Sequence, residues 1–368
     1  MFGIFSFRRN NMRWFSWRRI FVVMLILPVF TITLIVNRVF MILDYLFFPF
    51  FITQKVTSPV FIVAAPRTAT TFLFHLLTEQ KEYFTSFRLW EIIFAPSVTQ
   101  KYFWLFLGKI DHFLGFPVSK ILRIAEARIF GKFRTIHLIG LNMPEEDEAI
   151  LLWNMSTIYL NYFFPDTDWF TEYKNFDHAM PERKRKRINR YYMSCVKRHN
   201  YVFNRNDRKS FLSKNPVMMG KLKSLNEMYP DALILNINRC PSKVIPSTLA
   251  LNRSIYRAFT PHEASQFVNK LTVELIVSWY KLAFRNLNQL YKERYLSIDF
   301  RRLILSDKDV LISICKFLDL PVNTLSPVQS TKAADGHVSS NRYVELSKDE
   351  VESILQEIPF MKEYCNAG

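Results

Sequence analysis

The sequence has little of what several common kinds of functional site require. Its four cysteines (Cys195, Cys240, Cys315 and Cys365) are far apart and lack metal-ligand spacing, so the sequence predicts no metal site. They can be free thiols or form one or two disulfides, and the sequence does not decide between these states. The chain also lacks internal repeats and any recognisable nucleic-acid reader motif, so we expect no nucleic-acid partner.

Acidic residues are absent before Asp44, and the N-terminal segment carries basic residues instead: Arg8, Arg9, Arg13, Arg18 and Arg19. The stretch 20–36 that follows has no charged residue and is long enough to span the apolar part of a bilayer. Arginines on the N-terminal side of a span predict a cytoplasmic N-terminus, with the rest of the chain on the far side. A cleaved signal peptide is less favoured, because no small-residue cleavage site follows.

Composition and pattern divide the chain into successive parts. We expect a basic tail at 1–19, a transmembrane anchor at 20–36, an interfacial or packing helix with a linker at 37–57, and one domain at 58–368 with a helical insertion at 98–205. The run after the anchor is not expected to be a second span, because it contains Asp44 and Pro49. A composition of 49% hydrophobic residues is enough to fill a sizeable core.

Several apolar segments have the pattern of buried parallel strands: 60–65, 210–213, 232–237 and 295–298. Helical patterns alternate with them, including a helix at 307–318 that Ser306 is expected to cap. Strands that alternate with helices predict the α/β class, with a P-loop-like parallel sheet flanked by helices.

The first of these strands runs into a turn suited to an anion. Pro66 ends the strand and is followed by Arg67, Thr68, Ala69, Thr70 and Thr71, where a helix begins. Free amides at a helix start, a guanidinium and three hydroxyls are groups that bind phosphate or sulfate. The alternative is an ordinary strand-to-helix turn with an N-cap threonine.

The turn lacks both the glycines and the lysine of a Walker A motif, which makes a P-loop phosphotransferase or NTPase unfavoured. Cations also follow two later strands, at Lys214 and Arg239. Ligands of open α/β sheets bind at the carboxyl edge of the strands, so Arg67, Lys214 and Arg239 are expected to share one site. The net charge of +17 suits a polyanionic ligand or an anionic membrane surface.

The turn resembles the 5′-phosphosulfate loop of sulfotransferases that use 3′-phosphoadenosine 5′-phosphosulfate (PAPS), with Ala69 where that family usually has glycine. A positive φ at this position would cost alanine about 1 kcal/mol. The spacing from Arg239 to Ser247 resembles the 3′-phosphate signature of the same family, with Cys240 in place of its usual aspartate. The segments 89–91 and 144–148 resemble its membrane-anchored and bacterial-type members.

This resemblance implies PAPS as the cofactor. The cofactor-binding residues it implies are Arg67, Thr68, Ala69, Thr70, Thr71, Arg239 and Ser247, and the catalytic residues are Glu91, Lys214 and Arg67. Glu91 is expected to be the general base, with a pKa raised by desolvation between Trp90 and Phe94. Other candidates for the base are His75 and the acidic run Glu145–Glu148.

The function that the resemblance implies is transfer of a sulfuryl group to an acceptor hydroxyl on a glycan, a lipid, a tyrosine or a small alcohol. By analogy with membrane-anchored sulfotransferases, the location implied for a eukaryotic chain is the Golgi membrane. Two alternatives stay open: a membrane-anchored nucleotide-binding protein with a degenerate site, suggested by Ala69 and Cys240, and a phosphotransferase.

Overall fold

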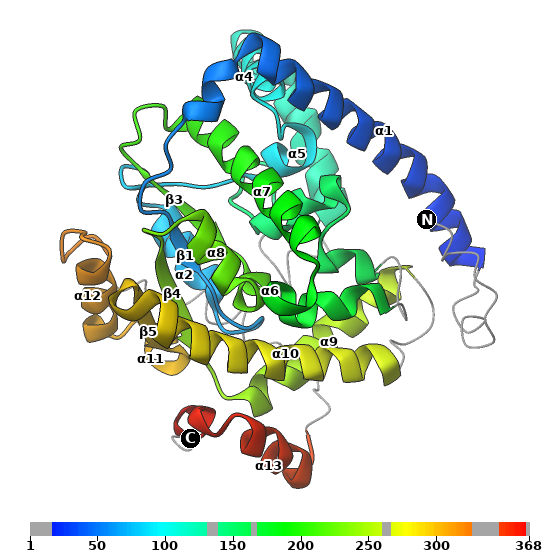
Figure 1. Cartoon of the computed structure of the whole chain (residues 1–368). Coiled ribbons are helices and arrows are strands. Elements are labelled where there is room, and N and C mark those ends of the chain that lie inside the picture. The colour runs from blue at the N-terminus through cyan, green and yellow to red at the C-terminus, as the bar shows by residue number, and fades with distance from the viewer. Residues whose placement is uncertain (1–16, 131–138, 163–167, 260–265, 326–345, 366–368) are drawn as a thin grey trace.

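The computed structural model describes residues 17–130, 139–162, 168–259, 266–325 and 346–365 (Figure 1). Most of the expected basic tail lies outside these residues.

A five-stranded sheet forms the centre of the domain, in the order β2-β3-β1-β4-β5, and all its strand pairs are parallel. The strands are β1 (Val60–Ile62), β2 (Phe84–Thr85), β3 (Ser210–Lys214), β4 (Leu233–Asn238) and β5 (Tyr295–Asp299). Each strand expected from the sequence is present, which confirms the α/β class. The sequence did not predict β2, because its two residues are too few to show a pattern.

Helices surround this sheet (Figure 1). They are α1 (Trp17–Phe47), α2 (Thr70–Thr78), α3 (Leu89–Phe94), α4 (Val98–Phe113), α5 (Pro117–Phe130), α6 (Phe176–Ala179), α7 (Glu182–Phe203), α8 (Leu222–Met228), α9 (Pro241–Phe259), α10 (Gln266–Asn286), α11 (Phe300–Ile304), α12 (Lys308–Phe317) and α13 (Lys348–Glu357). The described parts of the segment 98–205 hold α4 to α7 together with short 3-10 turns.

The two faces of the sheet pack into separate cores, as β1 shows. The Phe61 side chain belongs to the core that includes residues of α7, α8, α9 and α10. Val60 and Ile62 belong to the core that includes residues of α2 and α12. All three side chains are buried, which explains why this strand is an unbroken apolar run.

Helix α1 is continuous over 31 residues, so the helix boundary expected after residue 36 is wrong. The polar residues that interrupt the apolar pattern face the domain. Asn37 Oδ1 accepts a hydrogen bond from Gln100 at 2.7 Å, and Asp44 pairs with Arg198 at 2.7 Å. Because these groups are paired and buried, they do not end the helix.

Within the described part of the chain, α1 is the one helix long and apolar enough to cross a membrane. Its segment Met24–Phe47 has a mean hydropathy of 2.1, and only 11% of the most apolar window is buried. Most of this apolar surface therefore faces away from the domain.

The N-cap of α12 is Asp307, one residue after Ser306, so the expected cap is wrong. The Asp307 side chain accepts hydrogen bonds from the amides of Asp309, at 2.9 Å, and Val310. Ser306 has a φ of 50°, which differs from the extended backbone typical of an N-cap residue.

Candidate active site

The turn after β1 contains two residues with positive φ, of which the sequence predicted only Ala69. Arg67 and Ala69 both have left-handed backbone, with φ of 65° and 63°, so the position expected to require glycine does have positive φ. Thr68 is buried, and its hydroxyl donates to the carbonyl of Ala65 at 2.7 Å. Thr68 therefore holds the turn in shape, while α2 starts at Thr70 with its free amides at the carboxyl edge of the sheet.

Arg67, Arg239 and Ser247 come together beside this turn. The Arg67 Nε donates to Ser247 Oγ at 3.0 Å, and the Arg239 guanidinium donates to the Arg67 carbonyl. The Arg239 guanidinium also lies over the Phe300 ring, 4.1 Å from its centroid. The structure thus joins the residues that the sequence assigned to the two signatures.

A second cluster forms around Lys214, at the end of β3. The Lys214 ammonium lies 3.0 Å from Glu146 Oε1 and donates to Thr71 Oγ1 at 3.3 Å. The Lys214 side chain is 1% exposed and that of Glu146 is 23% exposed. The other Glu146 oxygen accepts a hydrogen bond from the Tyr159 hydroxyl. A buried cation, a partly accessible carboxylate and the start of α2 therefore meet at one point.

Backbone pairing between residues 87–89 and 143–145 positions the acidic run Glu145–Glu148 near Lys214. Arg88 and Pro144 form an antiparallel bridge, and the Glu145 amide donates to the Phe87 carbonyl at 3.1 Å. The Leu89 amide donates to the Met143 carbonyl, also at 3.1 Å. The two segments that resemble membrane-anchored and bacterial-type members are therefore neighbours in space.

The other acids of the run face inward. Glu148 is buried between Lys221, at 2.9 Å, and Asn215, at 3.1 Å. Asp147 accepts a hydrogen bond from Tyr192, and burial raises the pKa of Asp147 to about 6. Asp147 and Glu148 hold the core together around β3, and Glu145 accepts a hydrogen bond from the Glu146 amide at 2.9 Å. Glu146 is the member of the run that pairs with Lys214.

Glu91 lies in a different environment from the one expected. Its carboxylate is 2.8 Å from the His199 ring and 3.8 Å from the Lys101 ammonium, and it accepts a hydrogen bond from the Arg88 amide. Burial alone would raise the pKa of Glu91, but the interactions with His199, the charge of Lys101 and the hydrogen bond from the Arg88 amide outweigh it and lower the pKa. The expectation of a raised pKa is therefore wrong.

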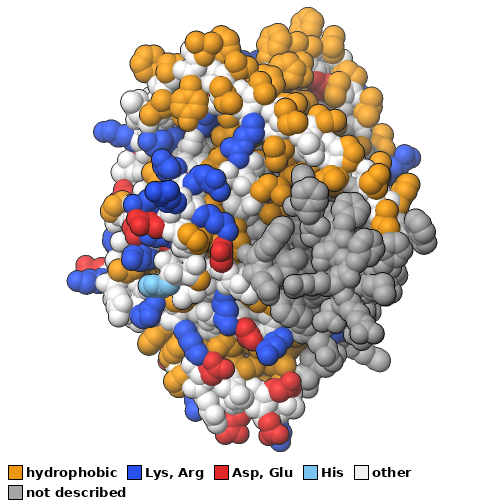
Figure 2. Space-filling view, turned by 45° about the vertical axis from the view of Figure 1, so that its right-hand side comes forward, with side chains coloured by type: hydrophobic (Ala, Val, Ile, Leu, Met, Phe, Trp, Pro, Cys, Tyr) orange, Lys and Arg blue, Asp and Glu red, His pale blue; other side chains and the backbone are white. Residues whose placement is uncertain are grey.

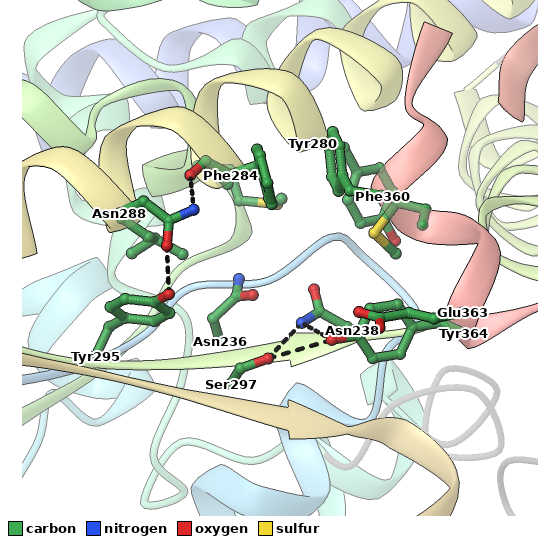
Figure 3. Close-up of a pocket in the computed structure, with 14 residues that line it drawn as sticks. Asn236, Asn238, Tyr280, Phe284, Asn288, Tyr295, Ser297, Phe360, Glu363 and Tyr364 are labelled. Atoms are coloured by element: carbon green, nitrogen blue, oxygen red, sulfur yellow. Dashed lines mark hydrogen bonds between the residues drawn. The ribbon is translucent and has the colours of Figure 1, made fainter. Parts of the chain in front are cut away.

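A pocket of about 200 Å³ lies beside Arg239, on the face of the sheet covered by α10 (Figure 3). Asn238 donates across it to Ser297, at 2.8 Å, and to Tyr364, at 3.2 Å. Helix α10 contributes Tyr280 to the lining of the pocket, and the Tyr280 hydroxyl donates to the Arg239 carbonyl at 3.0 Å.

A disulfide joins Cys240 to Cys365 beside this pocket, so two of the four cysteines are bridged, and Cys195 and Cys315 are buried free thiols. The bridge holds the wall containing Tyr364 against the segment that carries Arg239. The sequence did not pair these cysteines, because 125 positions separate them. Sequence reasoning also gave Tyr159 no specific role, because this residue belongs to an aromatic-rich segment in which no single position stands out. Within the described ranges, no group of three His, Cys, Asp or Glu side chains is placed to hold a metal ion.

Comparison with known proteins agrees with this geometry. The solved structure of sulfotransferase STF9 from Mycobacterium avium matches with a TM-score of 0.65 at 17% identity, over 89% of this chain and 82% of that one. Sulfotransferase STF1 from Mycobacterium tuberculosis H37Rv matches with a TM-score of 0.57 at 16% identity, over 88% and 82%. At such identities the likeness shows a shared fold.

A curated relative is similar over a shorter stretch. The omega-hydroxy-beta-dihydromenaquinone-9 sulfotransferase Stf3 of Mycobacterium tuberculosis is 28% identical over 158 residues, which cover 41% of this chain and 37% of that protein. The chain thus matches little more than a third of that relative's length. The model of the sulfotransferase family matches residues 59–324, which is most of the chain. The matched range contains both cation clusters at the carboxyl edge of the sheet, and the chain belongs to the sulfotransferase family.

Proposed function

We propose that this sulfotransferase moves a sulfuryl group from PAPS to the hydroxyl of a membrane-resident acceptor. The observation that supports the proposal best is the pair of cation clusters at the carboxyl edge of the sheet. One contains Arg67 with Ser247 and Arg239, and the other contains Lys214 with Glu146.

The donors present suit a ligand with several anionic groups. The Arg67 guanidinium lies within hydrogen-bond distance of the Ser247 hydroxyl, and the Arg239 guanidinium is held beside them by the Arg67 backbone carbonyl. The start of α2 offers free amides near Lys214 and Thr71. Charged donors of this kind hold phosphate and sulfate oxygens. Arg239 and Ser247 would hold the 3′-phosphate, and Arg67, Lys214 and the turn the phosphosulfate.

PAPS would supply the sulfuryl group and a nucleotide bisphosphate as leaving group. Lys214 and the α2 amides would stabilise the negative charge that grows on the leaving phosphate. Glu146 would take the proton of the acceptor hydroxyl as it attacks, because its carboxylate lies beside Lys214 and is partly accessible. This role fits Glu146 better than Glu91, whose carboxylate is buried and paired with His199.

The proposed acceptor is a lipid-like alcohol. The name of the curated relative describes a sulfotransferase acting on a hydroxylated menaquinone, which is a lipid-soluble molecule. The chain carries its own apolar helix α1 packed on the domain. An enzyme held at a bilayer meets hydroxyl groups of lipid-soluble acceptors without extracting them into water.

The proposed topology is a single span with a cytoplasmic N-terminus and the domain on the far side, in the Golgi lumen if the organism is eukaryotic. The Cys240–Cys365 disulfide supports it, because such bridges persist in oxidising compartments. Protease treatment of sealed vesicles tests this topology. Protection of the domain is expected, and digestion from the cytoplasmic side would contradict it.

An acceptor screen tests the function itself. The full-length chain in lipid vesicles is incubated with radiolabelled PAPS and a panel that includes a long-chain alcohol, an isoprenoid alcohol, a glycan and a tyrosine peptide. We expect labelled sulfate on an amphiphilic alcohol. Tight binding of adenosine 3′,5′-bisphosphate without transfer to any acceptor would favour a degenerate nucleotide-binding protein, and phosphate transfer from ATP would favour a phosphotransferase.

A further inference from the structure

The hairpin of helices α4 and α5 has an unusually apolar surface for a part of the protein in contact with water. Beyond its first turn, α4 exposes aromatic and aliphatic side chains around most of its circumference. They include Phe103 at 54%, Trp104 at 42%, Phe106 at 60% and Phe113 at 88% exposure. Exposed polar side chains lie near the C-terminal end of α4, at Lys109 and His112. A helix surface as apolar as the rest of α4 is normally buried in a core or in a membrane.

The hairpin is nevertheless firmly built. The Asp111 carboxylate accepts hydrogen bonds from the amides of Val118, at 2.8 Å, and Ser119, at 3.1 Å, so it fixes the turn and the start of α5. At the other end, Asp44 of α1 accepts from the amides of Val98 and Thr99, both at 2.9 Å, and so caps α4. The apolar surface therefore belongs to a defined element of the fold.

This surface continues the outer face of α1, the candidate membrane span. Helices α1 and α4 pack side by side, and an apolar hollow of about 330 Å³ lies between them. Its lining includes Val36 and Phe40 from α1 and Phe103 and Trp104 from α4. Figure 2 shows hydrophobic side chains gathered over the end of the molecule where Figure 1 places α1 and α4. A bilayer that surrounds α1 would also meet α4.

Helix α5 has the composition of a helix that lies at a membrane surface. It exposes Val118, Ile121 and Ile124 at 53%, 67% and 58%, and it also exposes the cations Lys120 and Arg123. Basic amphipathic helices with this pattern place their apolar side among acyl chains and their cations among anionic headgroups. A water-soluble partner protein would not need the apolar surface to be continuous with a membrane helix.

We propose that the α4–α5 hairpin inserts into the same bilayer as α1 and forms a second membrane contact of the domain. The hairpin lies between Glu91 and Glu146 in the sequence, and the Glu126 carboxylate of α5 accepts a hydrogen bond from the Leu141 amide at 2.6 Å, close to the Arg88–Pro144 bridge. This hydrogen bond joins the hairpin to the segment that carries Glu146, so the membrane contact holds the domain in one orientation relative to the lipid.

Site-directed fluorescence quenching in vesicles of zwitterionic and anionic lipid tests this proposal in the full-length chain. Cys195 and Cys315 are buried and the other two cysteines are bridged, so an introduced exposed thiol can be labelled selectively. Three single variants are labelled with the same environment-sensitive dye. They are Phe113→Cys on the hairpin, Leu25→Cys on α1 as a positive control, and Leu305→Cys, 80% exposed and remote from the hairpin, as a negative control.

We expect lipids with a quencher on the acyl chain to quench the Phe113 label as strongly as the Leu25 label, and to leave the Leu305 label unaffected. Adding Ile121→Glu is expected to abolish quenching at Phe113 but not at Leu25, because a carboxylate opposes insertion of α5. Quenching at Leu25 alone would overturn the proposal while leaving the α1 anchor in place. Energy transfer between labels on two copies, without quenching by lipid, would overturn it in favour of a contact between chains.

Discussion

Lys214 Nζ lies 3.0 Å from Glu146 Oε1, although the two residues come from distant parts of the sequence. This ion pair joins the end of β3 to the acidic run, at the point where α2 begins. It brings together a buried cation and a partly accessible carboxylate, to which we assign charge stabilisation and the role of base.

Glu146 and Glu91 can be told apart by a matched pair of variants. Glu146→Gln should lower turnover by about 10²–10⁴-fold while adenosine 3′,5′-bisphosphate still binds, because general-base contributions have this size. Glu91→Gln should unfold at a lower temperature and keep most of its turnover, because it loses the charge paired with His199 and Lys101. Steady-state kinetics and thermal unfolding measure both effects. A hundredfold loss in Glu91→Gln alone would return the role of base to Glu91.

Arg239→Ala should weaken binding of adenosine 3′,5′-bisphosphate about tenfold or more, because a hydrogen bond to a charged group contributes about 1.5–3 kcal/mol. Titration calorimetry measures the affinity. Arg302→Ala is the control, since Arg302 is a half-exposed arginine paired with Asp307 near the same sheet edge. Unchanged binding in a folded Arg239→Ala variant would contradict the 3′-phosphate assignment.

Ala69→Gly should stabilise the protein by about 0.5–1 kcal/mol, because glycine adopts the observed φ of 63° without strain. Ala64→Gly is the control: Ala64 is buried, lacks a positive φ and should lose stability on the same change. Denaturant unfolding compares the two. A loss of stability in both variants would mean that the turn carries no strain at Ala69.

Cys365→Ser should cost about 2–4 kcal/mol of unfolding free energy, the usual contribution of a disulfide. It should also weaken adenosine 3′,5′-bisphosphate binding, because the bridge partner Cys240 directly follows Arg239. Reduced wild-type protein should behave like the variant in both measurements. Equal stability of oxidised and reduced protein would show that the bridge has no structural role.

Asp147→Asn should raise the melting temperature at pH 8 and have little effect near pH 4. Burial raises the pKa of Asp147 to about 6, from 3.8 in the unfolded chain. The stability contributed by the protonated carboxyl is present below the unfolded pKa and lost as pH rises through 6. A shift of this size corresponds to about 3 kcal/mol at most. A difference in melting temperature between wild type and Asp147→Asn that does not change with pH would contradict the raised pKa of Asp147.

The cations at the ends of β1, β3 and β4 could be predicted from sequence, because parallel strands must end at one edge of the sheet. Arg67, Lys214 and Arg239 follow from that rule together with the apolar runs before them. The contact of Glu146 with Lys214 could not be predicted, because it depends on the Arg88–Pro144 bridge between distant segments. The Cys240–Cys365 disulfide could not be predicted either, because it depends on where the C-terminal segment packs against the domain.

The attachment of α1 has a consequence for proteolytic release of the domain. Enzymes tethered by a free stalk are shed when a protease cuts the stalk. Here a cut between α1 and β1 would leave the helix in place, because Asp44 supplies the partner of the buried Arg198 and Asn37 is bonded to Gln100. Separating a buried ion pair of this kind costs about 3–5 kcal/mol. The cleaved protein should therefore sediment with the membrane, and a soluble form would need a substitute for the whole inner face of the helix.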